Sequence, residues 1–171
     1  QWDKSLGLMA KAIDLAERHG ATQMLAGFHL NHGIILTKVG RFGEAGATLE
    51  KSLRLCRSLG DQIREPKVML ALGRLAFLEG KLVRAEESVL TGKHLAERLR
   101  MRRESIIADE YLGDIQLARH DAEKALVNYG IGLEKTRALG QAGDLEAELL
   151  RRVAEGQRQA GRAEDAIATA H

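Results

Sequence analysis

The side chains of this sequence that could do chemistry are few, and most lack the neighbours that such chemistry needs. His29 and His32 stand three residues apart and could share a metal ion on one helical face, but no cysteine or third histidine with ligand spacing lies near them. Cys56 is the single cysteine, and its surroundings lack the electropositive character that activates a thiolate. We therefore expect a thiol packed in the core and two histidines in the core or at its rim.

A run of glycines is the nearest approach to a phosphate-binding loop. Gly40, Gly43 and Gly46 are evenly spaced, but no Lys-Ser or Lys-Thr pair follows them and no strand is expected before them. The sequence also contains neither a G-x-S-x-G nor an H-E-x-x-H motif. Acidic pairs such as Glu86 and Glu87 fall on the solvent faces of expected helices. The sequence therefore predicts no enzyme activity, no cofactor and no metal site.

A basic stretch at residues 98–103 contains four arginines: Arg98, Arg100, Arg102 and Arg103. Glu97 and Glu104 flank it, no aromatic residue interleaves, and on a helix the guanidinium groups would fan around the axis. The formal net charge of +2 argues against a dedicated polyanion binder. We interpret the stretch as a solvated helix end with a favourable place in the helix dipole. Contact with a phosphate or an acidic partner is the alternative interpretation.

The elements that position these residues repeat along the chain with a period of forty residues. Glycines stand forty apart in the first expected helix of each repeat: Gly33, Gly73 and Gly113, with Ala154 one residue late. An alanine follows twelve residues after each of them: Ala45, Ala85, Ala125 and Ala166. Such self-similarity is typical of a solenoid, in which each unit buries its apolar face only against its neighbours.

Two further series mark the expected helix ends. Glycine suits the left-handed residue that ends a helix. One series is Gly40, Gly80 and Gly161, with His120 in place of a glycine, and the other is Gly20, Gly60 and Gly140, with Arg100 in place of a glycine. The same comparison of repeats places His19 in the interior, where Leu59 and its equivalents stand, and His94 on a solvent face.

Amphipathic spacing predicts helices along the whole chain. The first helix of one repeat is expected at Thr22–Val39. Second helices are expected at Lys4–Arg18, Gly43–Leu59, Leu82–Leu99 and Ala122–Leu139, and from Ala163 onward. The layout is one domain: an orphan second helix at 1–20, repeats at 21–61, 62–101 and 102–142, and an incomplete repeat at 143–171. We expect seven to nine antiparallel helices and no β-sheet.

The composition agrees with packed helices. The 171 residues are 44% hydrophobic but only 4% aromatic, and the single proline suits helices better than a β-sandwich. No apolar run reaches the roughly 18 residues that span a bilayer, so no membrane contact is expected. One cysteine cannot form an internal disulfide, and we expect a cytoplasmic protein. Periodic residues begin at once, so we expect a fragment of a longer chain whose cut ends associate end to end or are covered by neighbouring segments.

The repeated residues resemble the tetratricopeptide repeat. Its signature places Leu-Gly in the first helix, as in Leu72-Gly73 and Leu112-Gly113. In the second helix it places an alanine and then a larger residue four positions later: Ala45 and Leu49, Ala85 and Val89, Ala125 and Tyr129, Ala166 and Ala170. Small residues let the two helices approach, and large ones fill the gap beside them. The tryptophan and proline of the signature are missing from every repeat.

The forty-residue period resembles the long-helix variety of this repeat, as in kinesin light chain, spindle-orientation adaptors and large bacterial regulators. The resemblance covers essentially the whole chain. It implies an all-α solenoid of antiparallel helical hairpins in a right-handed superhelix, without catalysis of its own. The function it implies is a protein–protein interaction scaffold, the regulatory domain of a bacterial signalling or transcriptional regulator. The alternative is a sensor domain that binds a small ligand or a short signalling peptide in the groove.

In this family the first helix of each repeat lines a concave groove, so the resemblance implies a partner-binding surface there. The residues expected to be exposed lie three or six before the landmark glycine and one, four or five after it: Leu30, Ile34, Thr37, Lys38, Lys67, Leu70, Arg74, Phe77, Ile107, Glu110, Asp114, Leu117, Arg151, Glu155 and Arg158. The Lys/Asn/Arg set with which some family members hold a peptide carboxylate is missing. We expect Lys67, Leu70, Arg74 and Phe77 to form the centre of the site. The expected partner is a protein or peptide segment with apolar and acidic residues, with no direct nucleic acid contact.

Overall fold

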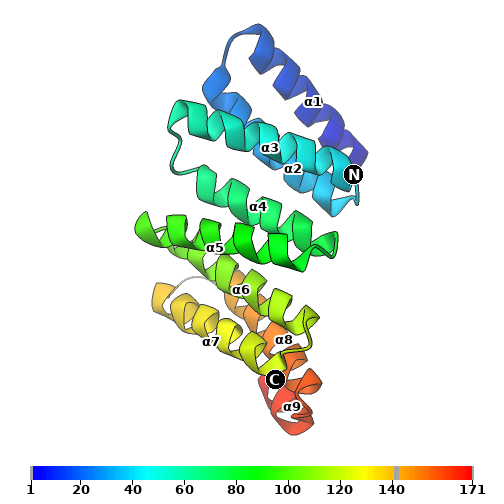
Figure 1. The fold of residues 1–171 in the computed structure, drawn as a ribbon, viewed down its shortest axis with the longest axis vertical. Helices are drawn as coiled ribbons and strands as arrows, with labels where there is room; N and C mark the ends of the chain where they lie inside the picture. Colours follow the sequence, from blue (N-terminus) through cyan, green and yellow to red (C-terminus); the bar gives the residue numbers. More distant parts are fainter. Residues whose placement is uncertain (1, 141–142, 171) are drawn as a thin grey trace. The chain divides into compact units, whose positions relative to one another are not determined.

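The computed structural model describes residues 2–140 and 143–170, apart from the side chains of residues 3, 163 and 170. Every regular element in this part of the chain is an α-helix, and consecutive helices run antiparallel (Figure 1). The helices are α1 (Trp2–Arg18), α2 (Thr22–Lys38), α3 (Phe42–Leu59), α4 (Glu65–Leu78), α5 (Leu82–Arg98), α6 (Arg102–Ala118), α7 (Ala122–Leu139), α8 (Gly143–Gln159) and α9 (Ala163–Ala170). None of them is both long and apolar enough to cross a membrane. The predicted all-α fold is confirmed.

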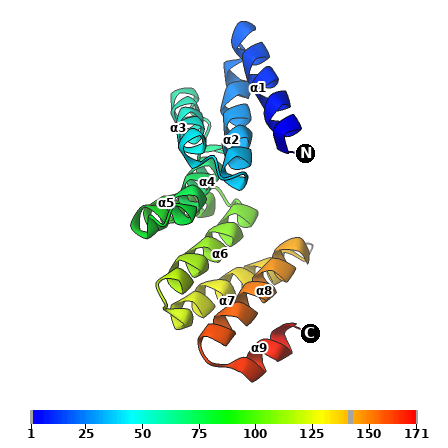
Figure 2. The same cartoon turned by 90° about the vertical axis from the view of Figure 1, so that its right-hand side faces the viewer.

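The chain forms two compact units, residues 1–92 and 93–171, and the boundary falls within α5. In the first unit α1 packs on α2, α2 on α3 and α3 on α4, and α2 also contacts α4. In the second unit α6, α7 and α8 lie side by side (Figure 2), α9 packs on α8, and α6 also contacts α8. Within each unit a first helix therefore contacts its own second helix and the next first helix, as stacked helical hairpins do.

The expected helices agree with the observed ones to within a few residues. The second helices expected from Leu82, Ala122 and Ala163 begin at those residues, and the one expected from Gly43 begins one residue earlier. The expected repeat boundaries stay a prediction. The boundary after residue 142 and the chain end at 171 involve residues 141, 142 and 171, which lie outside the described residues.

One helix begins later than its counterparts. The first helices α2 and α6 have 17 residues, whereas α4 has 14. In the turn before α4 the Arg64 N–H donates to Asp61 Oδ1 at 3.0 Å, and Pro66 stands in the first helical turn. Proline has no N–H and is tolerated at a helix start, where that N–H would have no partner within the helix. The capped turn and the proline together set the start of α4 at Glu65.

Among the glycines of the described chain, the landmark glycines would bring an added Cβ atom closest to a neighbouring helix. Each of them faces the large residue of its own repeat, in the pairs Gly33–Leu49, Gly73–Val89 and Gly113–Tyr129. A Cβ atom added at Gly73 would lie 2.5 Å from Val89 Cγ2, well inside contact distance. The three large residues are 0% exposed, and so are the alanines four positions before them. The steric interpretation of the repeated pattern is therefore confirmed.

Two residues with side chains occupy left-handed backbone positions at helix ends. In the described part of the chain, Arg100 (φ 55°) and His120 (φ 62°) are the residues other than glycine with positive φ. Their counterparts in the other repeats are glycines with φ between 63° and 80°. This conformation costs a residue with a Cβ atom on the order of 1 kcal/mol. The prediction that both residues stand in for a helix-ending glycine is confirmed.

The register of the repeats places most histidines correctly and one wrongly. His94 is exposed and His29 is 5% exposed, as predicted. His19, expected in the interior, is exposed, because it lies in the turn after α1, beyond the last buried residue of that helix, Ala16. His32 is half-buried and so lies at the rim of the core.

The contact between Gly113 and Tyr129 gives a direct test of the packing. Replacing Gly113 by Ala would place a methyl group inside the volume of the aromatic ring, which is rigid and fully buried. We expect the free energy of unfolding to fall by about 1–3 kcal/mol, as overpacked cores do. Chemical denaturation followed by circular dichroism measures it.

The matched control for that variant is Gly130→Ala in α7. An added Cβ at Gly130 has no atom within 4 Å, so this variant should gain up to about 1 kcal/mol from helix propensity. Equal stability changes in the two variants would contradict the proposed role of Gly113.

Candidate functional site

The side chains that could hold a metal or act as nucleophiles, Cys56 and His29, are buried in the packed interior. Cys56 is 1% exposed, which confirms a packed cysteine, and burial raises the pKa of its thiol. Burial also lowers the pKa of His29, whose Nε2 has no hydrogen-bond partner among the described residues. Within residues 2–140 and 143–170, no three His, Cys, Asp or Glu side chains are placed to share a metal ion.

The first unit leaves several of the predicted groove residues accessible. Ile34, Arg74 and Phe77 are half-buried, and Lys38 and Lys67 are exposed. The Arg74 Cζ atom lies 5.1 Å from the centroid of the Phe77 ring, at cation–π distance. This pair offers a flat apolar ring and a cation next to each other on α4, which is the combination expected at the centre of the site.

One pocket of about 350 Å³ joins α2 to the start of α4. It is lined by Met24, Gly27, Phe28, Leu30, Asn31, Arg64 and Lys67. We call it the α2–α4 pocket. It brings together Leu30 and Lys67, two predicted groove residues from successive repeats. Gly27 leaves room for the guanidinium of Arg64, since a Cβ there would lie 3.2 Å from Arg64 Nε. The pocket therefore combines apolar side chains with cationic ones.

The position three residues before the landmark glycine is buried, which corrects the expected exposure. Leu30 is 6% exposed and Leu70 is 4% exposed. Leu30 belongs to the core cluster that contains Leu49 of the second helix. Leu70 packs on the backbone of α5, because a Cβ at Gly92 would lie 3.0 Å from Leu70 Cδ2. Side chains at this position point toward the second helix and cannot form an exposed groove surface on their own.

The acidic residues expected on the third repeat are also buried. Glu110 is 7% and Asp114 is 4% exposed, and Arg152 of α8 pairs with both, with Nη2 at 3.0 Å from Glu110 Oε1. The Tyr129 hydroxyl donates to Asp114 Oδ1 at 2.9 Å. Burial and the Asp114 charge raise the pKa of Tyr129, which stays protonated. These charges stabilise the interior of the second unit, and the expectation that they are exposed is wrong.

The remaining predicted residues of the second unit are partly engaged with neighbours in their own helices. Arg151 is exposed and its Nη2 lies 2.8 Å from Glu148 Oε1. Glu155 accepts hydrogen bonds from Arg158 and Gln159, which lower its pKa to about 2. Ile107 is half-buried against the core of this unit. Their role in partner binding stays a prediction.

A second group of charges lies between α5, α6 and α7, and sequence reasoning missed it. Asp109 is 0% exposed; its Oδ1 lies 2.6 Å from Lys93 Nζ and its Oδ2 lies 2.6 Å from Lys135 Nζ. Lys135 also donates to Ser105 Oγ at 2.8 Å and to Glu97 Oε1 at 3.3 Å. We call Lys93, Asp109 and Lys135 the lysine–aspartate cluster. It places three charges at a junction between helices.

The forty-residue register contained a signal for this cluster. Lys93 stands where the other second helices have Ile13, Leu53 and Leu133, and Lys135 stands where they have Leu15, Leu55 and Leu95. Asp109 stands where the preceding first helices have His29 and Met69. A charge at a position that is apolar in other repeats must either reach solvent or find a partner. The register therefore marks Lys93, Asp109 and Lys135 as exceptions, and the structure shows that they pair with one another.

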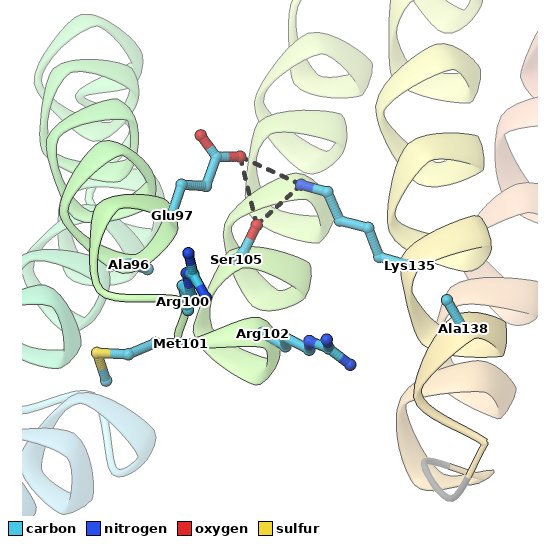
Figure 3. Close-up of a pocket in the computed structure, with 8 residues that line it drawn as sticks. All are labelled: Ala96, Glu97, Arg100, Met101, Arg102, Ser105, Lys135 and Ala138. Atoms are coloured by element: carbon cyan, nitrogen blue, oxygen red, sulfur yellow. Dashed lines mark hydrogen bonds and ion pairs between the residues drawn. The ribbon is translucent and has the colours of Figure 1, made fainter.

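Lys135 of the lysine–aspartate cluster also lines a larger pocket in the second unit. This basic pocket has a volume of about 620 Å³ and is lined by Ala96, Glu97, Arg100, Met101, Arg102, Ser105, Lys135 and Ala138. Figure 3 shows Lys135 reaching from α7 to Ser105 on α6 and Glu97 on α5. Three of its side chains are cations and one is a carboxylate, so the pocket carries a positive charge.

The fold is similar to that of a known protein. The crystal structure of BtubC (BKLC) from P. vanneervenii matches 98% of this chain and 70% of that chain, with a TM-score of 0.80 and 18% sequence identity. No protein-family model and no curated protein matches the sequence. At this identity the similarity concerns the fold alone. The chain has a tetratricopeptide-like fold of helical hairpins, as the sequence predicts.

The lysine–aspartate cluster predicts an unusual pattern of stabilities. Asp109→Asn removes the negative charge from between two lysines, and we expect the free energy of unfolding to fall by about 3–5 kcal/mol. A triple variant with the residues of other repeats (Lys93→Leu, Asp109→Met, Lys135→Leu) should be as stable as the parent or more so, because apolar side chains of similar size need no desolvated charge. Urea denaturation of both variants checks this.

The control for these variants is a surface ion pair in the same unit. Arg103→Gln removes a bond of 2.7 Å to Asp144 in which both side chains are more than half exposed, so its effect should stay below about 1 kcal/mol. A triple variant as unstable as Asp109→Asn would contradict the interpretation of the cluster as a replaceable ion-pair junction.

Proposed function

We propose that this chain is a protein-interaction scaffold whose first helices bind a segment of another protein. The observation that carries the proposal is the α2–α4 pocket, in which Leu30 and Lys67 from successive repeats line one hollow of about 350 Å³. A surface built from two successive repeats suits a partner that extends along the stack of helices. The tetratricopeptide-like fold supports the same function.

The chemistry of this surface indicates the partner. Met24 is 54% exposed, and methionine adapts its shape to apolar partners. Lys67 is exposed beside it, and Arg74 and Phe77 follow on the same helix α4. Arginine and aromatic residues supply much of the binding energy at protein interfaces. We therefore infer a partner segment with apolar residues for Met24 and Phe77 and acidic residues for the cations.

The proposed setting is the regulatory region of a larger cytoplasmic bacterial protein that takes part in signalling or transcription. Support for this setting comes from the resemblance of the repeats to those of large bacterial regulators. A sensor for a small ligand is the alternative function, since the basic pocket is within the size range of small-molecule sites. Both pockets are open to solvent on one side, which favours a bound segment over an enclosed small molecule.

A peptide selection tests the scaffold function. Peptides selected on this chain from a random phage-displayed library should combine apolar and acidic residues. Phe77→Ala and Arg74→Glu should each weaken their binding by more than about 1 kcal/mol, because each removes one half of the ring–guanidinium pair. Fluorescence anisotropy with labelled peptides measures the affinity, and circular dichroism verifies that helicity is unchanged.

Arg54→Glu is the matched control for the charge change. Arg54 is an exposed arginine on the second helix α3, whereas Arg74 and Phe77 are on the first helix α4. This variant should bind the selected peptides like the parent. If the double variant of Arg74 and Phe77 also binds every selected peptide like the parent, the partner surface is not on α4.

A further inference from the structure

The basic pocket shares no lining residue with the first-helix surface of the proposed function. Its walls come from the second helices α5 and α7 and from the turn and first residues of α6. All of its lining residues belong to the second unit. The pocket is therefore a separate place at which this chain could bind something.

Lys135 is held in place on the wall of this pocket. Its Nζ donates to Asp109, Ser105 and Glu97 at 2.6, 2.8 and 3.3 Å. Ser105 is 6% exposed and Asp109 is fully buried, so the lysine is fixed from behind by groups that cannot move away. A fixed cation binds an anion with less loss of conformational entropy than a free surface lysine does.

Two further cations of the pocket have no counter-ion. Within the described part of the chain, neither Arg100 nor Arg102 forms an ion pair, whereas nearby Arg103 and Arg137 pair with Asp144 and Glu146. An unpaired guanidinium offers a carboxylate two parallel N–H donors. The pocket therefore presents two unpaired arginines and one fixed lysine against the single carboxylate of Glu97.

The backbone at Arg100 adds a second argument. The corresponding helix ends have Gly20, Gly60 and Gly140, which adopt the left-handed conformation without strain. Arg100 adopts it with φ 55° and bears the strain of a Cβ atom there. A glycine would fit the fold better but would remove a cation from the pocket. The arginine is thus unfavourable for folding and favourable for an anionic ligand.

The other residues that line the basic pocket restrict the kind of ligand that it can bind. Met101, Ala96 and Ala138 give the pocket an apolar part, which a simple ion would leave unfilled. No aromatic side chain of the described residues lines it, so bases of a nucleic acid would find no such ring to stack on. Glu97 repels any anion, and it repels a doubly charged phosphate more strongly than a carboxylate. One carboxylate beside an apolar side chain matches the pocket in charge and in polarity.

We propose that the basic pocket binds an acidic side chain of a protein segment, with a neighbouring apolar residue against Met101. The carboxylate lies between the guanidinium groups of Arg100 and Arg102 on the side toward Lys135. This inference rests on the proposed scaffold function and adds a second binding surface to it, formed by α5, α7 and the start of α6. It selects an Asp or Glu next to an apolar residue.

The test uses the full chain and the same random-peptide phage library. One class of selected peptides should contain an acidic residue next to an apolar one and lose at least about tenfold in affinity with Arg100→Gly combined with Arg102→Gln, because two charged hydrogen-bonding groups are removed. The same class should keep its affinity for the Arg74→Glu, Phe77→Ala double variant. Arg98→Gln, an exposed arginine outside the pocket, should change it by less than about twofold.

The fold of the variants is checked independently of binding. Arg100→Gly removes the strain of a Cβ atom at a left-handed backbone position. We therefore expect the melting temperature of this variant to exceed that of the parent by about 2–4 °C. His120→Gly makes the same backbone change away from the pocket and should raise the melting temperature similarly while leaving peptide binding unchanged. Loss of binding in a stabilised variant therefore cannot come from unfolding.

The remaining outcomes separate this proposal from the scaffold function. If all selected peptides depend on Arg74 and Phe77 and none on Arg100 and Arg102, the basic pocket is not a binding site and the scaffold function stands. If no peptide is selected, both proposals fail. A single-stranded oligonucleotide or inorganic phosphate that binds with the same dependence on Arg100 and Arg102, in place of acidic peptides, would overturn the carboxylate assignment.

Discussion

The whole structure depends on how closely the two helices of a hairpin can approach each other. At Gly73 the backbone of α4 lies so near to α5 that an added Cβ atom would stand 2.5 Å from Val89. The large residue of each second helix fills the space that the missing side chain leaves, and it is completely buried. This fixed distance sets which side chains of the first helix can reach the surface. The contact between Gly73 and Val89 fixes which face of α4 is buried. Lys67, Arg74 and Phe77 are accessible residues on this helix.

The two units use different means to bury the rest of their helices. The first unit has an apolar core of leucines and alanines. The second unit buries charged groups as well, around Arg152 and in the lysine–aspartate cluster. Buried pairs of this kind contribute little net stability, because desolvation offsets most of their attraction. Because Glu110 and Asp114 are buried in these pairs, neither carboxylate can contact a partner. The accessible charge of the basic pocket remains positive.

The sequence predicted the helices, the glycine contacts and the left-handed residues Arg100 and His120, because each of these follows from one local requirement that recurs every forty residues. It failed where a residue departs from its repeat. A leucine three positions before the glycine looks like a groove residue until its contact with the second helix is known, as for Leu70. The carboxylate of Asp109 acquires its meaning from Lys93 and Lys135, which come from two other helices. The forty-residue register predicts the features that the repeats share. Which of the exceptional residues contact one another is known only from the three-dimensional structure.

The lysine–aspartate cluster also bears on how such a chain avoids misfolding. A protein made of similar repeats can pair helices in the wrong order, since each apolar face fits several others. At the junction of α5, α6 and α7, pairing with a wrong helix is energetically unfavourable. Any other first helix would bring an apolar residue or a histidine in place of Asp109 and would remove the carboxylate that the two partly buried lysines share, which is unfavourable. These three charges thus distinguish this junction from those of the other repeats in the described chain. They favour the correct order of the hairpins there.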